Sequence, residues 1–225
     1  MQLSDPAEIA ALKELTQQGD AVAQYKLGKI YQTGEFVRQD AKVAISWYEK
    51  SANLGNADAQ YELGEIYLDG SKANKNYKKA LGLFKASASQ GNTKDMLRLE
   101  TMYGMGLGVN RSGSISHKWL QKAALKGDIK AQTGLGEHFK RQGDYANAFK
   151  WYEQAAKYGY AEALVALGEL YEYGLGTPQD RTKSFELYQK AAERGNDEAI
   201  FKLGIKYGKD SEDIDSHENA DDWDE

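Results

Sequence analysis

Apolar and small side chains recur at helical spacing along most of this chain, in a pattern that predicts pairs of short helices. In the first full copy, Leu27 and Tyr31 share one face of a helix predicted from about residue 21 to residue 32. A second helix is predicted after Asp40, a good N-cap residue, and it carries the adjacent aromatic residues Trp47 and Tyr48. Gly residues follow each helix and predict its end. The unit is therefore a helical hairpin.

The hairpin pattern repeats at nearly constant spacing. Successive copies are separated by 36, 36, 36, 32 and 36 residues, measured between the glycines that close each copy. These glycines are Gly19, Gly55, Gly91, Gly127, Gly159 and Gly195. Repeats of this length indicate a stacked helical array, in which neighbouring hairpins bury one continuous core and present a long surface.

The spacing predicts an all-α solenoid of antiparallel helix-turn-helix repeats, with about five full repeats and a partial repeat at each end. Residues 1–18 are expected to form a capping helix that begins near Pro6. The expected full repeats are 19–54, 55–90, 91–126, 127–158 and 159–194, and a truncated sixth repeat follows over 195–225. The fourth repeat has lost four residues between Phe139 and Asp144, so its loop should be shorter.

A glycine lies in the middle of the first helix of most repeats, where it would let the second helix approach closely. These glycines are Gly28, Gly64, Gly136, Gly168 and Gly204. The third repeat has Glu100 at this position instead. Since burying an unpaired carboxylate is costly, Glu100 must reach solvent or find a polar partner.

The last sixteen residues, 210–225, carry nine Asp or Glu residues and no Lys or Arg. Charge alone favours a disordered acidic tail. However, the tail can be aligned with the second helix of the first repeat. In this alignment, Ser216 corresponds to Asp40, Ala220 to Ala44 and Trp223 to Trp47. We therefore expect a short helix whose Trp223 docks on the last hairpin, or else an acidic tail.

Composition excludes several classes of function. The chain has no cysteine, which excludes disulfides, thiolate zinc sites and cysteine nucleophiles. The net charge is −5 overall and +4 over residues 1–209, which is too weak and too scattered to predict a nucleic-acid surface. The N-terminus lacks the pattern of a signal peptide, and no stretch approaches the length of a membrane span. We expect a cytoplasmic protein without a membrane partner.

The sequence gives little support for catalysis or cofactor binding. Its three histidines are far apart and lack a second metal ligand at helical spacing, so no metal or cofactor is expected. The glycine-rich stretches 104–108 and 174–176 follow a helix, whereas a phosphate loop would follow a strand, and we interpret them as turns between helices. A hydrolase or small-molecule binder using Glu137, His138 and Glu169 is the rival hypothesis.

The repeat unit reads G-x-A-x-A-x-x-x-L-G-x-x-Y-x-x-G, followed by D-x-x-x-A-x-x-W-Y-x-x-A-A-x-x-G. This unit resembles the Sel-1-like repeat, a relative of the tetratricopeptide repeat, and the resemblance covers about residues 19–209. It implies a right-handed superhelix of antiparallel helix pairs. Members of this family typically serve as adaptors or scaffolds for other proteins, and the family has no catalytic residues to carry over.

By similarity to tetratricopeptide arrays, the first helix of each repeat would line a concave face that binds a protein or peptide. The predicted partner-binding residues are Tyr25, Lys29, Tyr61, Glu65, Leu68, Leu97, Thr101, Met105, Glu137, Lys140, Arg141, Glu169 and Tyr173. Aromatic and apolar groups dominate the N-terminal part. In the C-terminal part, Lys140 and Arg141 are expected to oppose Glu169 and Glu172. Aromatic anchors beside mixed charge suit polypeptide recognition.

We therefore predict a non-enzymatic protein-interaction module that binds one protein or peptide and is itself a monomer. A sharper alternative is an immunity-type protein that inhibits a toxin or an enzyme stoichiometrically. The sequence holds no motif that separates an inhibitor from a scaffold.

Overall fold

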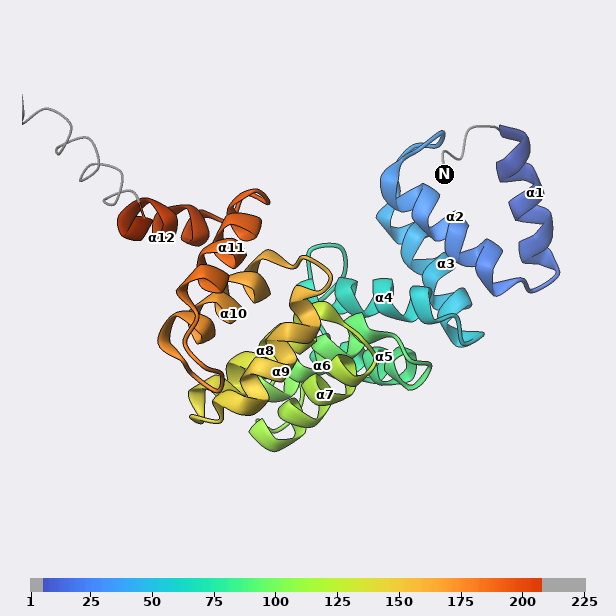
Figure 1. Cartoon of the computed structure of the whole chain (residues 1–225). Coiled ribbons are helices and arrows are strands. Elements are labelled where there is room, and N and C mark those ends of the chain that lie inside the picture. The colour runs from blue at the N-terminus through green and yellow to red at the C-terminus, as the bar shows by residue number, and fades with distance from the viewer. Residues whose placement is uncertain (1–5, 208–225) are drawn as a thin grey trace, which may run out of the picture. The chain divides into compact units, whose positions relative to one another are not determined.

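The computed structural model describes residues 6–207, which contain twelve α-helices and no strand (Figure 1). The helices are α1 (Pro6–Gln17), α2 (Ala21–Thr33), α3 (Ala41–Asn53), α4 (Ala57–Asp69), α5 (Tyr77–Ser89), α6 (Thr93–Met105), α7 (Gly113–Leu125), α8 (Ile129–Arg141), α9 (Tyr145–Ala156), α10 (Ala161–Tyr173), α11 (Arg181–Ala192) and α12 (Asp197–Tyr207). The predicted tail helix with Trp223 lies outside the described residues.

These helices belong to two compact units. The first unit spans Met1–Lys126 and holds α1 to α7, and the second spans Gly127–Glu225 and holds α8 to α12. After α1, each unit alternates the two helices of the hairpin. We call α2, α4, α6, α8, α10 and α12 the first helices, and α3, α5, α7, α9 and α11 the second helices.

The two helices of each hairpin are antiparallel, as hydrogen bonds at both ends of the first pair show. At one end, the Asp40 backbone N–H donates to the Tyr31 carbonyl near the end of α2, over 3.0 Å. At the other end, the Ser51 hydroxyl near the end of α3 donates to the carbonyl of Ala21, the first residue of α2, over 2.6 Å. Ser87 makes the same bond to Ala57 in the next hairpin, over 3.1 Å.

Local sequence explains where the helices start and stop. The Asp40 side chain accepts from the backbone N–H groups of Lys42 and Val43, which have no partner within the helix. Gly34 ends α2 in the left-handed conformation, at φ 78°. A similar glycine ends α4, α6 and α10. Residues 106–108 and 174–176 therefore lie between helices as predicted, whereas Gly104, at the start of the first glycine-rich stretch, still belongs to α6.

The mid-helix glycines allow the close packing that the sequence predicts. A Cβ atom built on Gly28 would lie 2.5 Å from Cε1 of Tyr48, and one built on Gly136 would lie 2.7 Å from Cδ1 of Tyr152. The Tyr48 and Tyr152 side chains are fully buried against these backbones. The Phe84 ring packs on Gly64 in the same way, and the Tyr188 ring packs on Gly168. Gly204 in α12 has no neighbouring atom within 4 Å among the described residues.

The third hairpin has different residues at the contact between its two helices. Glu100 replaces the glycine, and the second helix has the smaller Leu120 where the other repeats have a ring. The half-buried Glu100 carboxylate accepts from the hydroxyl of Ser116 over 3.2 Å, and the Thr101 hydroxyl oxygen lies 3.2 Å from its other oxygen. The expectation that this carboxylate finds a polar partner is thus confirmed.

In both units, the loop inside one hairpin packs on the second helix of the preceding hairpin. A Cβ on Gly108 would lie 2.7 Å from the backbone of Tyr77, and one on Gly176 would lie 2.5 Å from the backbone of Tyr145. Both glycines have positive φ. At the equivalent place in the first hairpin stands Phe36, which has φ 63° and is 54% exposed.

Candidate partner-binding face

The predicted partner-binding residues all lie on first helices, but they are divided between the two units. We call the surface that they form in each unit the first-helix face. In the first unit it comprises Tyr25, Lys29, Tyr61, Glu65, Leu68, Leu97, Thr101 and Met105, from α2, α4 and α6. In the second unit it comprises Glu137, Lys140, Arg141, Glu169 and Tyr173, from α8 and α10.

The two predicted aromatic anchors of the first unit also take part in packing. The Tyr25 ring lies 5.9 Å from that of Tyr48, and the Tyr61 ring lies 6.2 Å from that of Phe84, measured between ring centroids. Both tyrosines are half-buried. Burial, with a smaller effect from Glu62 and Asp58, raises the pKa of Tyr25 to about 12. Each ring therefore offers only part of its surface to a partner.

The apolar residues of the first-helix face differ widely in exposure. Leu68 and Leu97 are half-buried, and the Thr101 hydroxyl donates to the Leu97 carbonyl over 3.1 Å. By contrast, Met105 in α6 is 69% exposed and Tyr173 in α10 is 58% exposed. These two residues hold the same position, the last residue of a first helix.

Neighbouring first helices in the first unit are joined by ion pairs that sequence reasoning missed. Lys29 Nζ lies 3.1 Å from Glu62 Oε1. The Arg98 guanidinium makes two bonds to the Glu65 carboxylate, Nε to Oε1 over 2.6 Å and Nη2 to Oε2 over 2.8 Å. These bonds raise the pKa of Arg98 above its usual value. The sequence feature that could have identified both ion pairs is two opposite charges separated by 33 residues.

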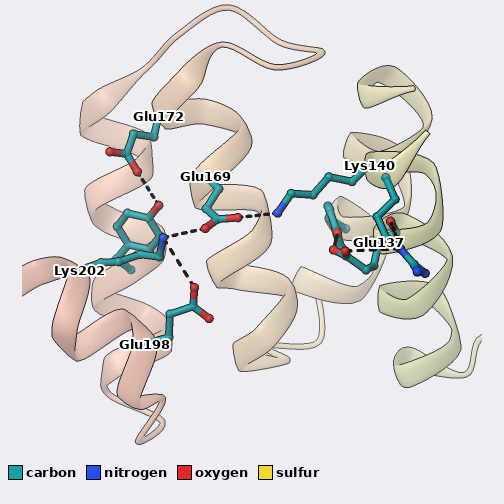
Figure 2. Close-up of polar contacts among 9 residues, drawn as sticks. Glu137, Lys140, Glu169, Glu172, Glu198 and Lys202 are labelled. Atoms are coloured by element: carbon teal, nitrogen blue, oxygen red, sulfur yellow. Dashed lines mark hydrogen bonds and ion pairs between the residues drawn. The ribbon is translucent and has the colours of Figure 1, made fainter. Parts of the chain in front are cut away.

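In the second unit, Glu169 is held between two lysines (Figure 2). Its carboxylate accepts from Lys140 on α8 and from Lys202 on α12, each over 2.7 Å. Lys202 also lies 3.6 Å from Glu198. Burial would raise the pKa of Glu169, but the hydrogen bonds from the two lysines outweigh it and hold that pKa below the usual value. Lys140 and Glu169 thus face each other as predicted.

The other charged residues of this unit have different surroundings. Glu137 accepts from the Tyr152 hydroxyl over 2.9 Å, and its second oxygen lies 3.7 Å from Nε of the exposed Arg141. Glu172, which was expected on the open face, is instead buried and accepts from the Tyr188 hydroxyl over 2.8 Å. The expectation was wrong because the Tyr188 ring from α11 reaches across to this side of α10.

A cleft of about 460 Å³ opens on the first-helix face of the second unit. Its walls come mainly from α8 and α10, with Tyr152 from α9, Tyr160 from the loop before α10 and Glu198 from α12. The lining residues are Lys130, Thr133, Gly134, Glu137, Lys140, Tyr152, Tyr160, Glu162, Val165, Ala166, Glu169 and Glu198. The cleft therefore combines charged groups, two tyrosines and a few small side chains.

Most of the chain matches a known repeat family. A family model described as Sel1 repeat matches five stretches, which are residues 21–56, 57–92, 101–128, 129–160 and 161–196. The chain belongs to the Sel1 repeat family. The third match begins directly after Glu100, where this repeat departs from the glycine-and-ring packing of the others.

Solved structures of other Sel1 repeat proteins resemble this chain closely. A protective antigen of uropathogenic Escherichia coli with an SLR fold is 31% identical, with a TM-score of 0.82, over 88% of this chain and 43% of its own. This chain thus spans less than half the length of that antigen. A Sel1 repeat protein from Oxalobacter formigenes is 28% identical, with a TM-score of 0.81, over 90% of this chain and 85% of its own.

More distant proteins share the fold. An immunity protein from Pseudomonas aeruginosa is 24% identical, with a TM-score of 0.54, over 91% of this chain and 71% of its own, which shows a likeness of fold. No curated protein has a sequence that matches this chain. Together with the Sel1 repeat match, the neighbours establish an all-helical Sel1 solenoid, a fold generally devoted to protein interaction and generally non-enzymatic.

The residues of the rival catalytic hypothesis are not gathered in one site. Glu137 and Glu169 line the cleft of this Sel1 repeat protein, but His138 is not among the lining residues. The His138 ring instead lies 3.1 Å from the Gln142 amide and edge-on to Phe139. Within residues 6–207, no group of three or more His, Asp or Glu side chains is arranged to hold a metal ion.

Of the helices within residues 6–207, none has the length and apolar character needed to cross a bilayer.

One acid, Asp95 in α6, is fully buried and was not predicted from the sequence to be so. The signal was present, because Asp95 stands where the other first helices have Ala23, Ala59, Ala131 and Ala163.

Proposed function

We propose that this chain is a non-enzymatic interaction module that binds a protein or peptide through its first-helix face. The observation that carries the proposal is the exposure of Met105 and Tyr173. Each is a large apolar side chain left in solvent at the same position of a first helix, one in each unit. Around them lie half-buried apolar residues and paired charges, a composition that suits the core and rim of a protein interface.

The structure also guides the choice of variants. Replacing Tyr25 and Tyr61 by alanine would remove ring contacts inside the repeats, so loss of binding could not be separated from loss of packing. Met105→Ser combined with Tyr173→Ser changes side chains that are 69% and 58% exposed. A matched control is Leu125→Ser combined with Tyr158→Ser. These residues are each 70% exposed, one in each unit, and lie outside the first helices.

The test is affinity capture from native extract with quantitative mass spectrometry, using the full chain and both double variants. We expect a stoichiometric protein that the wild type and the control variant retain and that the Met105→Ser, Tyr173→Ser variant loses. Equal capture by both variants, or loss with the control variant alone, would place the binding surface elsewhere and contradict the proposal.

The captured protein then distinguishes two roles for the module. If the module inhibits its partner as an immunity protein does, titrating it into that protein should abolish the partner's activity at a one-to-one ratio and with very tight affinity. A scaffold should leave the partner's activity intact. This readout tests the biological role separately from the location of the binding surface.

A further inference from the structure

Three inter-helix ion pairs follow one rule, which the pair of Lys140 and Glu169 does not share. The residue directly after the mid-helix glycine pairs with the residue two places before the equivalent position of the next first helix, which is a glycine or, in α6, Glu100. Lys29 pairs with Glu62, Glu65 pairs with Arg98, and Glu169 pairs with Lys202, each over a separation of 33 residues. The long side chains of each pair bridge the space between neighbouring first helices.

Between α8 and α10, only one of the two positions that would form such a pair carries a charged residue. Glu137 directly follows Gly136 and so holds the position of Glu65, whereas the position of Arg98 is taken by Ala166. The alanine side chain ends at its methyl group and cannot reach a carboxylate on the neighbouring helix. The space that an arginine would fill is instead part of the cleft, which both Glu137 and Ala166 line.

The Glu137 carboxylate has partners on its own hairpin but keeps the capacity for another. Its Oε2 atom accepts one hydrogen bond from Tyr152. Its Oε1 atom lies 3.7 Å from Nε of Arg141, beyond hydrogen-bond length, and both of these side chains are about half or more exposed. An ionised carboxylate accepts up to about four hydrogen bonds, and a guanidinium can supply two in parallel.

The residues that line the cleft include more carboxylates than ammonium groups. Its lining holds the carboxylates of Glu137, Glu162, Glu169 and Glu198, against the ammonium groups of Lys130 and Lys140. Lys140 is already bonded to Glu169 (Figure 2). Glu162 is exposed at the rim. Lys202 is bonded to Glu169 and lies 3.6 Å from Glu198, so these two carboxylates already have a cation beside them. A positively charged group entering the cleft would therefore meet, at Glu137, the carboxylate that can accept further bonds.

We infer that the cleft receives an arginine side chain of the partner, which pairs with Glu137 as Arg98 pairs with Glu65. This inference rests on the proposed function, since it assumes a protein or peptide partner, and it specifies one residue of that partner. The cleft volume of about 460 Å³ lies in the range of side-chain and small-ligand sites. Gly134 and Ala166 are the two smallest residues of the lining.

The first test uses the peptide acetyl-Gly-Arg-Gly-amide and its neutral analogue, in which citrulline replaces arginine. The full chain, labelled with ¹⁵N, is titrated with each peptide while amide shifts are followed by NMR. We expect saturable shifts in α8 and α10 with the arginine peptide and at least about tenfold weaker binding of the citrulline peptide, a difference of one charged pair. Equal shifts with the two peptides would overturn the inference, as would stronger binding of a lysine peptide.

Variants connect the shifts to Glu137. Glu137→Gln keeps an oxygen that can accept from Tyr152 but removes the charge, and should weaken binding of the arginine peptide about tenfold. Glu153→Gln, which makes the same change on the exposed side of α9, should leave that binding unchanged. Retained affinity in the Glu137→Gln protein would overturn the inference.

A second variant supplies the missing cation from within the chain. Ala166→Arg should fill the cleft, pair with Glu137, abolish the shifts caused by the arginine peptide and raise the melting temperature. Gln154→Arg adds the same charge at an exposed position of α9 and should do neither. If Ala166→Arg binds the peptide as well as the wild type does, the cleft is not the site.

The outcomes separate this inference from the proposed function. Suppose the captured partner depends on Met105 and Tyr173 while the arginine peptide fails to bind. Then only the arginine site is wrong. If the peptide binds at Glu137 while capture is insensitive to Met105 and Tyr173, these two exposed residues are not the anchors of the interface, and only the cleft part of the first-helix face binds.

Discussion

Asp95 is fully buried, and its Oδ2 atom lies 2.6 Å from the hydroxyl oxygen of Ser87. The same hydroxyl lies 3.1 Å from the Ala57 carbonyl, and Oδ1 of Asp95 has no partner among the described residues. A serine hydroxyl has one hydrogen. Both contacts are therefore full hydrogen bonds at the same time only when Asp95 carries a proton and donates it to Ser87.

Stability should consequently depend on pH through Asp95. Burial, together with the charges of Glu65 and Asp58, outweighs the Ser87 hydrogen bond and raises the pKa of Asp95 to about 6. The folded chain thus holds this proton more tightly than the unfolded chain, whose pKa is about 3.9. The stabilisation is fully present below pH 4 and is lost as the pH rises through 6. The difference in melting temperature between wild type and Asp95→Asn, measured from pH 4 to pH 8, should show this trend, and a flat difference would contradict it.

Replacing Asp95 by alanine should stabilise the protein at neutral pH. Alanine occupies this position in the neighbouring first helices, and it removes a buried carboxylate oxygen that lacks a partner. The expected gain is about 1–3 kcal/mol in the free energy of unfolding at pH 7.5. Urea titration measures it, and a loss of stability in Asp95→Ala would show that the bond to Ser87 is worth more than the burial costs.

Gly28→Ala should destabilise the first hairpin. The new Cβ would lie 2.5 Å from the Tyr48 ring, so the ring or the helix must move, and such overpacking costs about 1–3 kcal/mol. Gly82→Ala is the matched control, because Gly82 lies within α5 and has no neighbouring atom within 4 Å among the described residues. Thermal unfolding should show a lower melting temperature for Gly28→Ala. Gly82→Ala should instead gain up to about 1 kcal/mol from helix propensity.

The third hairpin should accept the packing of the other repeats only when both partners change. Glu100→Gly alone should leave a cavity beside Leu120. Leu120→Tyr alone should overpack the contact, because the new ring would meet the Glu100 side chain. The double variant recreates the pair that Gly28 and Tyr48 form. A double-mutant cycle of urea unfolding should therefore give a favourable coupling of about 1–3 kcal/mol. If the changes in the free energy of unfolding of the two single variants simply add, the new ring does not pack on the new glycine, and the prediction is wrong.

Phe36→Gly should stabilise the first hairpin loop. Phe36 has φ 63°, a left-handed conformation that costs a residue with a side chain about 1–2 kcal/mol. Glycine removes this cost, but it loses more backbone entropy on folding, which costs about 0.5–1 kcal/mol. Phe36→Ala keeps the strain and is the control for the exposed ring. Unfolding by urea should rank Phe36→Gly above Phe36→Ala by up to about 1 kcal/mol, and the reverse order would contradict the strain.

The helices could be predicted because their signals are local. Periodicity placed the first helix at about residues 21–32, and α2 spans Ala21–Thr33. Asp40 was identified as an N-cap from its residue type, and it accepts two backbone hydrogen bonds. Packing at Gly28 was predicted because glycine in mid-helix requires a reason beyond helix propensity.

The candidate site could be predicted less completely, because it depends on which residues of neighbouring repeats face each other. Helical spacing placed Glu65 on the first-helix face but did not identify Arg98 as its partner, since that contact crosses from one repeat to the next. The same limit applies to Glu172, whose burial results from a ring on the second helix. Lys140 and Glu169 were paired correctly because their opposite charges lie on successive first helices.

The inter-helix ion pairs of the first unit also fix the order in which its repeats can follow one another. Lys29 faces an acid, Glu62, whereas Glu65 faces a base, Arg98. If residues 55–90 were duplicated in tandem, Glu65 would face the copy of Glu62, and two carboxylates would meet where an ion pair now lies. Lengthening this part of the chain by internal gene duplication would therefore require a compensating charge reversal, so each repeat has become specific to its neighbours.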